Sequence, residues 1–424
     1  MDEKRYFHAI QLLNDKCKGC MHCVRICPTE ALRIRDGIVH MDEARCVDCG
    51  KCISVCPFDA IIPTSDSLNQ INRYEYKVAI VSASYAGQFT EDIDYSTTIK
   101  ALYYIGFDMV IEESMASEVM TRIKQHYITT NKEVRPILSS NCPAVIRLIQ
   151  VRFPSLLPNI FHIEAPMSVL SMYYRDKICI EKGINPDQIG IFLIVPCISQ
   201  VTAVHQPEGA YKRIQEGAIA IRDVYTAVRD KLPYIKSLDI PVTTHERGLT
   251  RALSGHEADE VGNQQIRTLA VSGIDNVIEI LQKVENHILD QYDYIVLRSC
   301  TNGCVGGVLN VENPFIARSR IHVLIRDAKD EDHELDSCFS CYLDGTFDVL
   351  PLEPRSIMEL DKDIKQAILK MKKLQEIMAQ LPLIDCGACG SPNCRALAED
   401  IVQGRASIDN CVILLKKNID KNEE

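Results

Sequence analysis

Short apolar runs alternate with amphipathic stretches along the middle of the chain, from residue 73 to 356. Apolar runs of strand length occur at 76–83, 136–140, 189–197, 268–273 and 292–300. Between them, apolar residues recur at helical spacing at 95–106, 116–127, 143–153, 218–232 and 276–289. Strands that alternate with helices are typical of parallel sheets covered by helices. The pattern therefore predicts an α/β domain with parallel sheets over residues 73–356.

A longer amphipathic stretch follows at residues 357–381. Its apolar positions alternate spacings of three and four, as in an a/d stripe: Ile357, Leu360, Ile364, Ala367, Met371, Leu374, Met378 and Leu381. Two interpretations stay open, because such a stripe packs either against its own chain or against a second copy in a homodimer. Pro382 ends the predicted helix, and a last domain is predicted at 382–424.

Composition and charge narrow the class of protein. The chain has 424 residues, of which 46% are hydrophobic and 25% charged, as in ordinary globular proteins. A net charge of -11 disfavours nucleic acid or an anionic membrane surface as a partner. The charged start, MDEKRYFHAI, does not predict a secretory signal, and the longest apolar run, at 191–198, is too short to span a bilayer. We therefore expect a cytoplasmic protein.

Nineteen cysteines change this picture. An odd count and tight clustering disfavour a disulfide framework in a reducing cytosol, and clustered thiolates instead select zinc, copper(I) or iron–sulfur clusters. Two runs, CKGCMHCVRICP and CVDCGKCISVCP, repeat the spacing C-x2-C-x2-C-x3-C-P. This is the pattern of bacterial ferredoxins with two 4Fe–4S clusters. The doubled spacing and both prolines favour clusters over a pair of zinc knuckles.

The fourth cysteine of each such run ligates the other cluster. We therefore expect one cubane on Cys17, Cys20, Cys23 and Cys56. The second cubane is expected on Cys46, Cys49, Cys52 and Cys27. Residues 1–72 are thus predicted to form a bacterial-ferredoxin-like domain that precedes the α/β domain.

A second cysteine motif lies near the end of the chain. Its ligands follow a C-x2-C-x4-C-x16-C spacing, at Cys386, Cys389, Cys394 and Cys411. Four cysteines also suit zinc by number. The spacing resembles the small 4Fe–4S domain of corrinoid iron–sulfur proteins, and in an iron–sulfur-rich chain it favours a cubane over zinc. Residues 382–424 are therefore predicted to form a small helical 4Fe–4S domain.

Three predicted strands of the α/β domain end in cysteine, in PILSSNC, IFLIVPC and YIVLRSC. Ligands of parallel α/β sheets bind outside the carboxyl ends of the strands. Cys142, Cys197 and Cys300 are therefore expected to converge on one crevice, together with Cys304 in CTNGCVGG. Taken singly, each cysteine would be better interpreted as a buried structural thiol, but four together predict a cluster site.

A two-cluster ferredoxin module followed by NCP, VPC and SCTNGCVGG resembles the FeFe-hydrogenases, from Cys17 to about residue 326. The resemblance implies an H-cluster, which is a cubane joined by one thiolate to a diiron unit with CO, CN and a dithiolate bridge. By resemblance, Cys142, Cys197, Cys300 and Cys304 hold this cofactor, with Cys304 as the bridging thiolate. The small C-terminal cluster domain is similar to that of the sensory, less active branches of the family.

The chain departs from the family around these cysteines. Highly active members carry a proton-transferring cysteine at the position of Asn141, and Gln200 replaces a lysine near a cyanide. Val195 and Arg298 stand where methionines are usual, and the family's acidic relay is not recognisable in EESMASEVMTRIKQ. Because changes around the ligands retune a metal centre, these departures imply an altered site rather than a lost one.

Asn141 bears most directly on turnover. A carboxamide donates and accepts hydrogen bonds but does not titrate, so it cannot act as a proton shuttle. Low turnover is therefore expected unless protons take another route, for which Glu164 or a water chain is a candidate. Asn141 is also expected to cap the helix that begins at Pro143, since asparagine is a good capping residue.

Three cysteines have no assigned cluster. Cys179 is interpreted as a packed thiol, and Cys338 and Cys341 form CFSC, either a redox-active pair or half of a metal site. No histidine motif for a metal and no nucleotide-binding motif is present in the sequence.

The predicted function is reversible H2 oxidation at a diiron H-cluster, with electrons relayed by 4Fe–4S clusters to a redox partner, in a slow or H2-sensing protein. Four 4Fe–4S clusters are expected in all. The competing hypothesis is an iron–sulfur electron-transfer or cluster-assembly protein that has lost diiron chemistry. A homodimer through residues 357–381 is a further expectation.

Overall fold

The computed structural model describes residues 6–209, 214–326, 328, 334–355, 360 and 363–416. Contacts within the chain define two compact units. The first unit comprises residues 1–46, 50–62 and 354–424, and the second comprises 47–49 and 63–353. The ferredoxin-like module and the C-terminal module, at opposite ends of the sequence, therefore belong to one unit.

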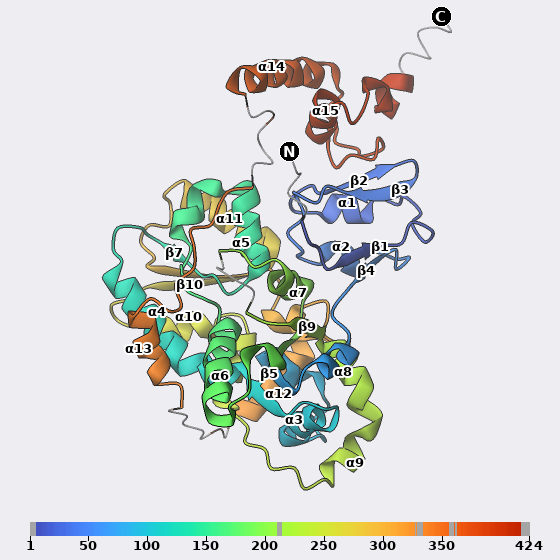
Figure 1. Ribbon diagram of the computed structural model, residues 1–424. Helices are drawn as coiled ribbons and strands as arrows, with labels where there is room; N and C mark the ends of the chain where they lie inside the picture. The colour runs from blue at the N-terminus through green and yellow to red at the C-terminus, as the bar shows by residue number, and fades with distance from the viewer. Residues whose placement is uncertain are drawn as a thin grey trace, which may run out of the picture. The chain divides into compact units, whose positions relative to one another are not determined.

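The second unit is built on two parallel sheets (Figure 1). The larger sheet has the order β6–β5–β8–β9 and consists of β5 (Tyr76–Val81), β6 (Met109–Glu112), β8 (Ile189–Val195) and β9 (Gly217–Ala220). The smaller has the order β10–β11–β7 and consists of β7 (Ile137–Leu138), β10 (Thr268–Ser272) and β11 (Tyr294–Arg298). Every pairing in both sheets is parallel, which confirms the predicted class of fold.

Helices follow the strands, as the alternating pattern predicts. They are α3 (Tyr95–Tyr104), α4 (Ser117–Thr130), α5 (Pro143–Arg152), α6 (Pro166–Lys182), α7 (Ile198–His205), α8 (Ile221–Val228), α9 (Leu232–Lys236), α10 (His256–Val261), α11 (Ile274–Glu285), α12 (Pro314–Ile325) and α13 (Ser337–Leu343). The core of the larger sheet is apolar throughout, because β5 and β8 are covered on both faces. Ala79, Val81, Phe192 and Ile194 pack there with Leu102 of α3.

The expectation of one helix over 218–232 is wrong at its start. Residues 217–220 form β9, which pairs with the carboxyl half of β8. The run AIAI is fully buried there, and a short continuous apolar run suits a buried strand as well as a helix. The helix proper, α8, begins at Ile221.

The first unit contains two two-stranded sheets and short helices (Figure 1). Its elements are β1 (Ile10–Leu12), α1 (His22–Ile26), β2 (Leu32–Arg35), β3 (Ile38–Met41), α2 (Lys51–Ser54), β4 (Ile61–Pro63), α14 (Ile364–Gln380) and α15 (Cys394–Val402). β2 and β3 form an antiparallel hairpin, and β1 pairs with β4.

The amphipathic stretch at 357–381 forms α14 from Ile364 onward, and Ile357 lies outside the described residues. Leu374, Ile377 and Leu381 are buried against α15 and the C-terminal cysteines. Ile364 is 77% and Met371 47% exposed. The C-terminal half of the stripe therefore packs within its own chain, as Leu360 does at the other end, whereas Ile364 and Met371 face outward.

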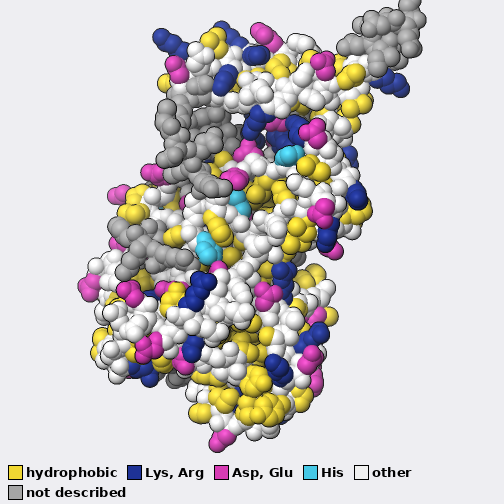
Figure 2. All heavy atoms as spheres, turned by 45° about the vertical axis from the view of Figure 1, so that its right-hand side comes forward, with side chains coloured by type: hydrophobic (Ala, Val, Ile, Leu, Met, Phe, Trp, Pro, Cys, Tyr) yellow, Lys and Arg dark blue, Asp and Glu magenta, His cyan; other side chains and the backbone are white. Residues whose placement is uncertain are grey.

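Acidic and basic side chains are interspersed on the face drawn in Figure 2, without a large field of one sign. Among the described residues, no helix combines the length and the apolar character needed to cross a membrane.

Candidate metal centre

Four cysteines come together at the carboxyl ends of the two parallel sheets. Cys142 follows β7, Cys197 follows β8, and Cys300 and Cys304 follow β11. All four line one small cavity of about 20 Å³, together with Asn141, Pro143, Gln200, Arg298, Ser299 and Gly303. Residues from three strands and two sheets thus form one site, as expected where parallel strands end.

The loops that carry these cysteines are packed closely. A β-carbon on Gly307 would lie 2.3 Å from the carbonyl oxygen of Pro196 and 3.2 Å from Cβ of Cys197. Gly303 has φ near +90°, a conformation that favours glycine. The glycines of CTNGCVGG therefore let the loop after β11 approach the loop after β8.

The thiols of this cavity are suited to binding iron. Burial raises the pKa of Cys197 to about 11 and the pKa of Cys304 to about 12. Buried thiols of this kind stay protonated at neutral pH until a metal replaces the proton. Four soft donors around one cavity fit a 4Fe–4S cluster.

Asn141 points to a buried carboxylate. Its Nδ2 donates a 2.8 Å hydrogen bond to Oε2 of Glu257, on α10. The N-cap residue of α5 is Cys142, and no side chain caps that helix. The expectation that Asn141 caps α5 is therefore wrong, because its carboxamide is engaged with Glu257.

Glu257 is the centre of a buried polar network. Its Oε1 accepts from Nζ of Lys124 at 2.6 Å and from the hydroxyl of Tyr294 at 2.8 Å. Burial alone would raise the pKa of the Glu257 carboxyl, but Lys124, Arg298 and Arg251 together hold it well below its usual range. Glu257 is therefore an anion at neutral pH, fixed by three cations.

Arg298 connects this network to the cysteines. Its Nη2 donates to Oε2 of Glu257 at 2.8 Å, and its Nη1 lies 3.5 Å from Sγ of Cys304. The guanidinium opposes the effect of burial on the Cys304 thiol by favouring the thiolate. The family resemblance leads us to expect a methionine at position 298. Arg298 instead places a cation beside Cys304, the cysteine that the resemblance assigns as the bridging thiolate.

A larger cavity, of about 130 Å³, shares Asn141, Pro143 and Gln200 with the cysteine cavity. Most of its lining is apolar, from residues such as Ile163, Met167 and Leu193. Oε1 of Gln200 is buried and has no hydrogen-bond partner among the described residues. An unsatisfied buried acceptor at the junction of two cavities is consistent with a bound group that supplies its partner.

Three carboxyl groups line the larger cavity, those of Glu113, Glu164 and Glu208. Burial raises the pKa of Glu164, although hydrogen bonds from Ser168 and Ala165 oppose the shift. Glu113 accepts from the Ser82 hydroxyl at 3.2 Å and from the Ala83 N–H at 3.1 Å. The stretch EESMASEV, in which no acidic relay was recognised, therefore does place a carboxylate at the cavity.

Sequence reasoning also missed Lys124 and Glu257. Both interrupt apolar stripes: Lys124 lies four residues from Met120 and from Ile128, both buried in α4. A charged residue at a core position was the available signal, since such groups are rarely buried unless paired. Val195, in contrast, is simply a buried residue at the end of β8.

Cysteines of the two ferredoxin runs lie close to one another. Burial, and then Cys20, Cys17 and Cys56, raise the pKa of Cys23 to about 11, so the fourth cysteine of the second run lies near the first three of the first run. The backbone N–H groups of Ala31 and Ala60 donate to Cys27 and Cys56 respectively, at 3.2 and 3.3 Å. The two runs therefore share one local geometry.

The C-terminal cysteines also gather. Cys394 and Cys411 are buried in one apolar cluster with Leu374 and Leu397, and Cys389 packs against it. Burial raises the pKa of the Cys394 thiol. The donor set fits a soft metal or an iron–sulfur cluster.

The remaining cysteines do not join these sets in the described structure. Cys338 is fully buried in α13, and burial, together with nearby Cys341, raises its pKa to about 12. A thiol with a raised pKa is a poor nucleophile, so the geometry favours packing over redox activity. Cys179 lies on α6 and is partly buried.

Family comparisons match three parts of the chain. Residues 75–215 match the "Iron only hydrogenase large subunit, C-terminal domain" family, and residues 16–60 match the "4Fe-4S dicluster domain" family. Residues 381–413 match an Fe–S cluster family. The chain is also 50% identical over 36 residues to the corrinoid/iron-sulfur protein large subunit of Moorella thermoacetica, a match that covers 8% of each chain.

The chain is similar to hydrogenases and to assembly factors. It is 24% identical to the NADP-reducing hydrogenase subunit HndD of Solidesulfovibrio fructosivorans (47% of this chain, 32% of that one) and 22% identical to iron hydrogenase 1 of Clostridium pasteurianum (48% and 41%). It is 21% identical to the cytosolic Fe-S cluster assembly factor NAR1 of Sclerotinia sclerotiorum (31% and 24%). The matches thus span less than half of each of these relatives.

Solved structures of the [FeFe]-hydrogenase HydA show the same fold. The HydA(deltaEFG) structure covers 68% of this chain and 98% of its own, with a TM-score of 0.54 and 13% identity. An apo HydA1 variant from Chlamydomonas reinhardtii gives 0.53 at 13% identity, over 68% of this chain and 97% of its own.

The fold and the grouped cysteines define an iron–sulfur protein with a hydrogenase-type α/β domain. The chain is an FeFe-hydrogenase-like protein with an N-terminal dicluster ferredoxin module and a C-terminal iron–sulfur region.

Proposed function

We propose that the protein catalyses or senses H2 at a diiron H-cluster, slowly, and that its 4Fe–4S clusters carry the electrons. When bound, the diiron unit would supply the heterolytic splitting of H2 and its reverse. Cys142, Cys197, Cys300 and Cys304 would hold the cofactor. Four cubanes are proposed, two in the ferredoxin module, one in the α/β domain and one in the C-terminal module.

The observation that carries this proposal is the pair of adjoining cavities in the second unit. One is lined by four cysteines and the other is mostly apolar, and they share Asn141 and Gln200. A mostly apolar cavity beside the cysteines would admit a small apolar gas, whereas an electron-transfer site needs only the cysteines. The second cavity thus favours a site that accommodates more than a cubane.

The residues around the site have separate roles in this proposal. Arg298 stabilises negative charge on Cys304, and Gln200 offers hydrogen bonds to a group in the cavity. Asn141 cannot relay protons, and Glu257 is held as an anion by three cations. Protons would reach the cavity through Glu113 or Glu164, without a titrating group at position 141. The expected result is a low rate.

The alternative is an iron–sulfur protein of electron transfer or cluster assembly. Similarity to NAR1 assembly factors supports it, as does Arg298, a cation beside Cys304 where the family resemblance leads us to expect a methionine. The second cavity supports the hydrogenase-like function instead. A cytoplasmic location and a redox partner protein remain expectations for either function.

Infrared spectroscopy of protein that has been matured with the diiron cofactor separates the two functions. We expect bands of bound CO and CN that respond to H2. Protein with full cubane content and no such bands after maturation would support the alternative.

A further inference from the structure

We propose that the ferredoxin module holds the C-terminal cysteine loop in electron-transfer contact, so that the two modules form one relay. The contact joins the loop of Cys17, Cys20 and Cys23 to the loop of Cys386 and Cys389. This inference rests on the proposed C-terminal cluster and does not depend on H2 conversion. Its test is therefore independent of the test of the diiron site.

The two ligand loops touch at Met21 and Gly387. Met21 lies between Cys20 and Cys23, and Gly387 lies between Cys386 and Cys389. A β-carbon on Gly387 would lie 3.1 Å from Cε of Met21, and Gly387 has φ near +72°. Met21 also has a positive φ, of 70°, which is uncommon for a residue with a side chain. An electron-transfer path between the two sets of cysteines would therefore pass through Met21 on one side, Gly387 on the other, and one van der Waals contact between them.

A backbone hydrogen bond fixes the C-terminal loop on the edge of β2. The N–H of Ile34 donates to the carbonyl oxygen of Gly390 at 2.8 Å. A β-carbon on Gly390 would lie 2.0 Å from the carbonyl oxygen of Ile34, so no residue larger than glycine fits this approach. The loop is thus held to the hairpin by its own main chain as well as by side chains.

Two arginines of the ferredoxin module bind the carbonyl groups of C-terminal ligand residues. Nη2 of Arg25 donates to the oxygen of Cys386 at 3.0 Å, and Nη1 of Arg35 donates to the oxygen of Cys389 at 3.2 Å. Net charge and hydrogen bonding around a cluster set its reduction potential. The two guanidinium groups therefore favour the reduced form of a cluster in this loop, which a purely mechanical contact would not require.

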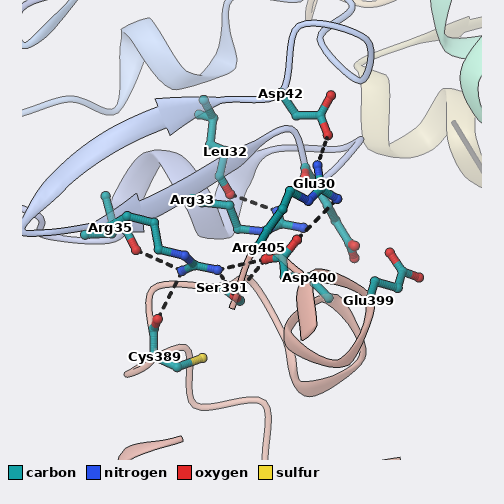
Figure 3. A network of polar contacts seen from close by, with 12 residues as sticks. Glu30, Leu32, Arg33, Arg35, Asp42, Cys389, Ser391, Glu399, Asp400 and Arg405 are labelled. Carbon is teal, nitrogen blue, oxygen red and sulfur yellow. Dashed lines mark hydrogen bonds and ion pairs between the residues drawn. The ribbon is translucent and has the colours of Figure 1, made fainter. Parts of the chain in front are cut away.

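Asp400 is the centre of the contact (Figure 3). Its Oδ2 accepts from Nε of Arg33 at 2.7 Å and from Nη2 of Arg35 at 2.8 Å, and its side chain is 4% exposed. Further pairs surround it, from Arg45 to Glu399 at 3.0 Å and from Arg405 to Asp42 at 3.1 Å. Removing one partner of a buried pair leaves an uncompensated charge, so this network resists separation of the modules.

The step across this contact is a single-electron transfer. One cubane is oxidised by one electron while its neighbour is reduced by the same electron, and no atom or proton moves. The electron crosses from the loop that carries Met21 to the loop that carries Gly387, or in reverse. The C-terminal module thereby extends the relay rather than storing a separate cluster.

Electron paramagnetic resonance of the reduced, cluster-loaded full chain tests this inference. The spectrum of a Cys386→Ser/Cys389→Ser variant is subtracted from that of the wild type, which isolates the contribution of the C-terminal cluster. We expect a difference spectrum broadened by coupling to the ferredoxin clusters. We expect Asp400→Asn to lose this broadening at unchanged iron content, whereas Asp409→Asn, an exposed aspartate of the same module, keeps it.

Arg25→Gln provides a second test should Asp400→Asn fail to fold, because Arg25 is exposed. Loss of this cation should make the C-terminal cluster harder to reduce in a redox titration, in which the Cys386→Ser/Cys389→Ser variant identifies the step that belongs to this cluster. A wild-type difference spectrum of an isolated cluster, zinc in place of iron in this module, or an unshifted Arg25→Gln titration would overturn the proposal.

Discussion

The ferredoxin module and the α/β domain hold their cysteines in opposite ways. In the ferredoxin module, the first three cysteines of each run lie within one short loop, and only the fourth proposed ligand of each cluster comes from the other run. In the α/β domain, four cysteines come from three separate strand ends, and Glu257, which lies on another segment and is paired with Lys124, holds Arg298 beside Cys304. The first arrangement is local and the second is tertiary.

This difference teaches where each property of a cluster originates. Ligand identity follows from cysteine spacing, because a short loop must bring its thiolates to one point. The electrostatic surroundings follow from the fold, because the groups that set them are distant in sequence. The charged network of the α/β domain is therefore the feature that distinguishes its site from an ordinary cubane.

The largest expected effect is on metal content. It tests the cysteine sets of the ferredoxin module, the α/β domain and the C-terminal module. Protein reconstituted with iron and sulfide alone should bind about sixteen irons, four for each set of four cysteines. Cys389→Ser/Cys394→Ser should remove about four of them, and Cys179→Ser, outside every set, should remove none. About twelve irons and one zinc in the wild type would contradict the C-terminal assignment.

The sequence could predict the parallel α/β class and indicate the proposed ligand sets, because both depend on local patterns. Cys17 to Cys56 and Cys386 to Cys411 follow from spacing, and the strand ends suggested the grouping of Cys142, Cys197, Cys300 and Cys304. The role of Asn141 could not be predicted, because its partner Glu257 is 116 residues away. The contact of Asp400 with Arg33 joins opposite ends of the chain and has no local signal.

Glu257→Gln should break the network that marks the α/β domain. The change leaves Lys124 and Arg298 buried without a counter-charge, which typically costs about 3–5 kcal/mol. Urea unfolding of the second unit, followed in the cluster-loaded protein, measures this loss.

Asp259→Asn is the matched control for Glu257→Gln, because Asp259 is exposed on the same helix. We expect its effect to stay within about 0.5 kcal/mol. Equal stability of the two variants would show that Glu257 does not hold the cations together.

Glu164→Gln should change how stability depends on pH. Because burial raises the pKa of Glu164, the native state binds more protons than the unfolded state above pH 4.5, and the free energy of unfolding falls as pH rises through that window. Glutamine does not titrate and removes this fall. The free energy of unfolding of the variant, compared with that of the wild type, should therefore be higher at pH 8 than at pH 4. Thermal unfolding at several pH values measures it, with exposed Glu118→Gln as the control. An unchanged profile would argue against a buried, shifted carboxyl.

The smallest effect is expected at Met371, on the exposed half of the α14 stripe. Met371→Lys should change the free energy of unfolding by less than about 0.5 kcal/mol, because the side chain is 47% exposed. If that half of the stripe is the proposed dimer seam, the variant should sediment as a monomer and the wild type as a dimer. A wild-type monomer would remove the proposed homodimer.

Asn141→Cys tests the central claim, that the site holds its cofactor but lacks a proton shuttle. Asn141→Ala is the matched control, since both changes remove the donor to Glu257 and only cysteine adds a thiol, with a pKa of about 8.5. H2 evolution is measured at matched diiron content. We predict that Asn141→Cys is at least about tenfold faster than Asn141→Ala and faster than the wild type. Equal rates for the two variants, or a wild type already as fast as Asn141→Cys, would contradict the account.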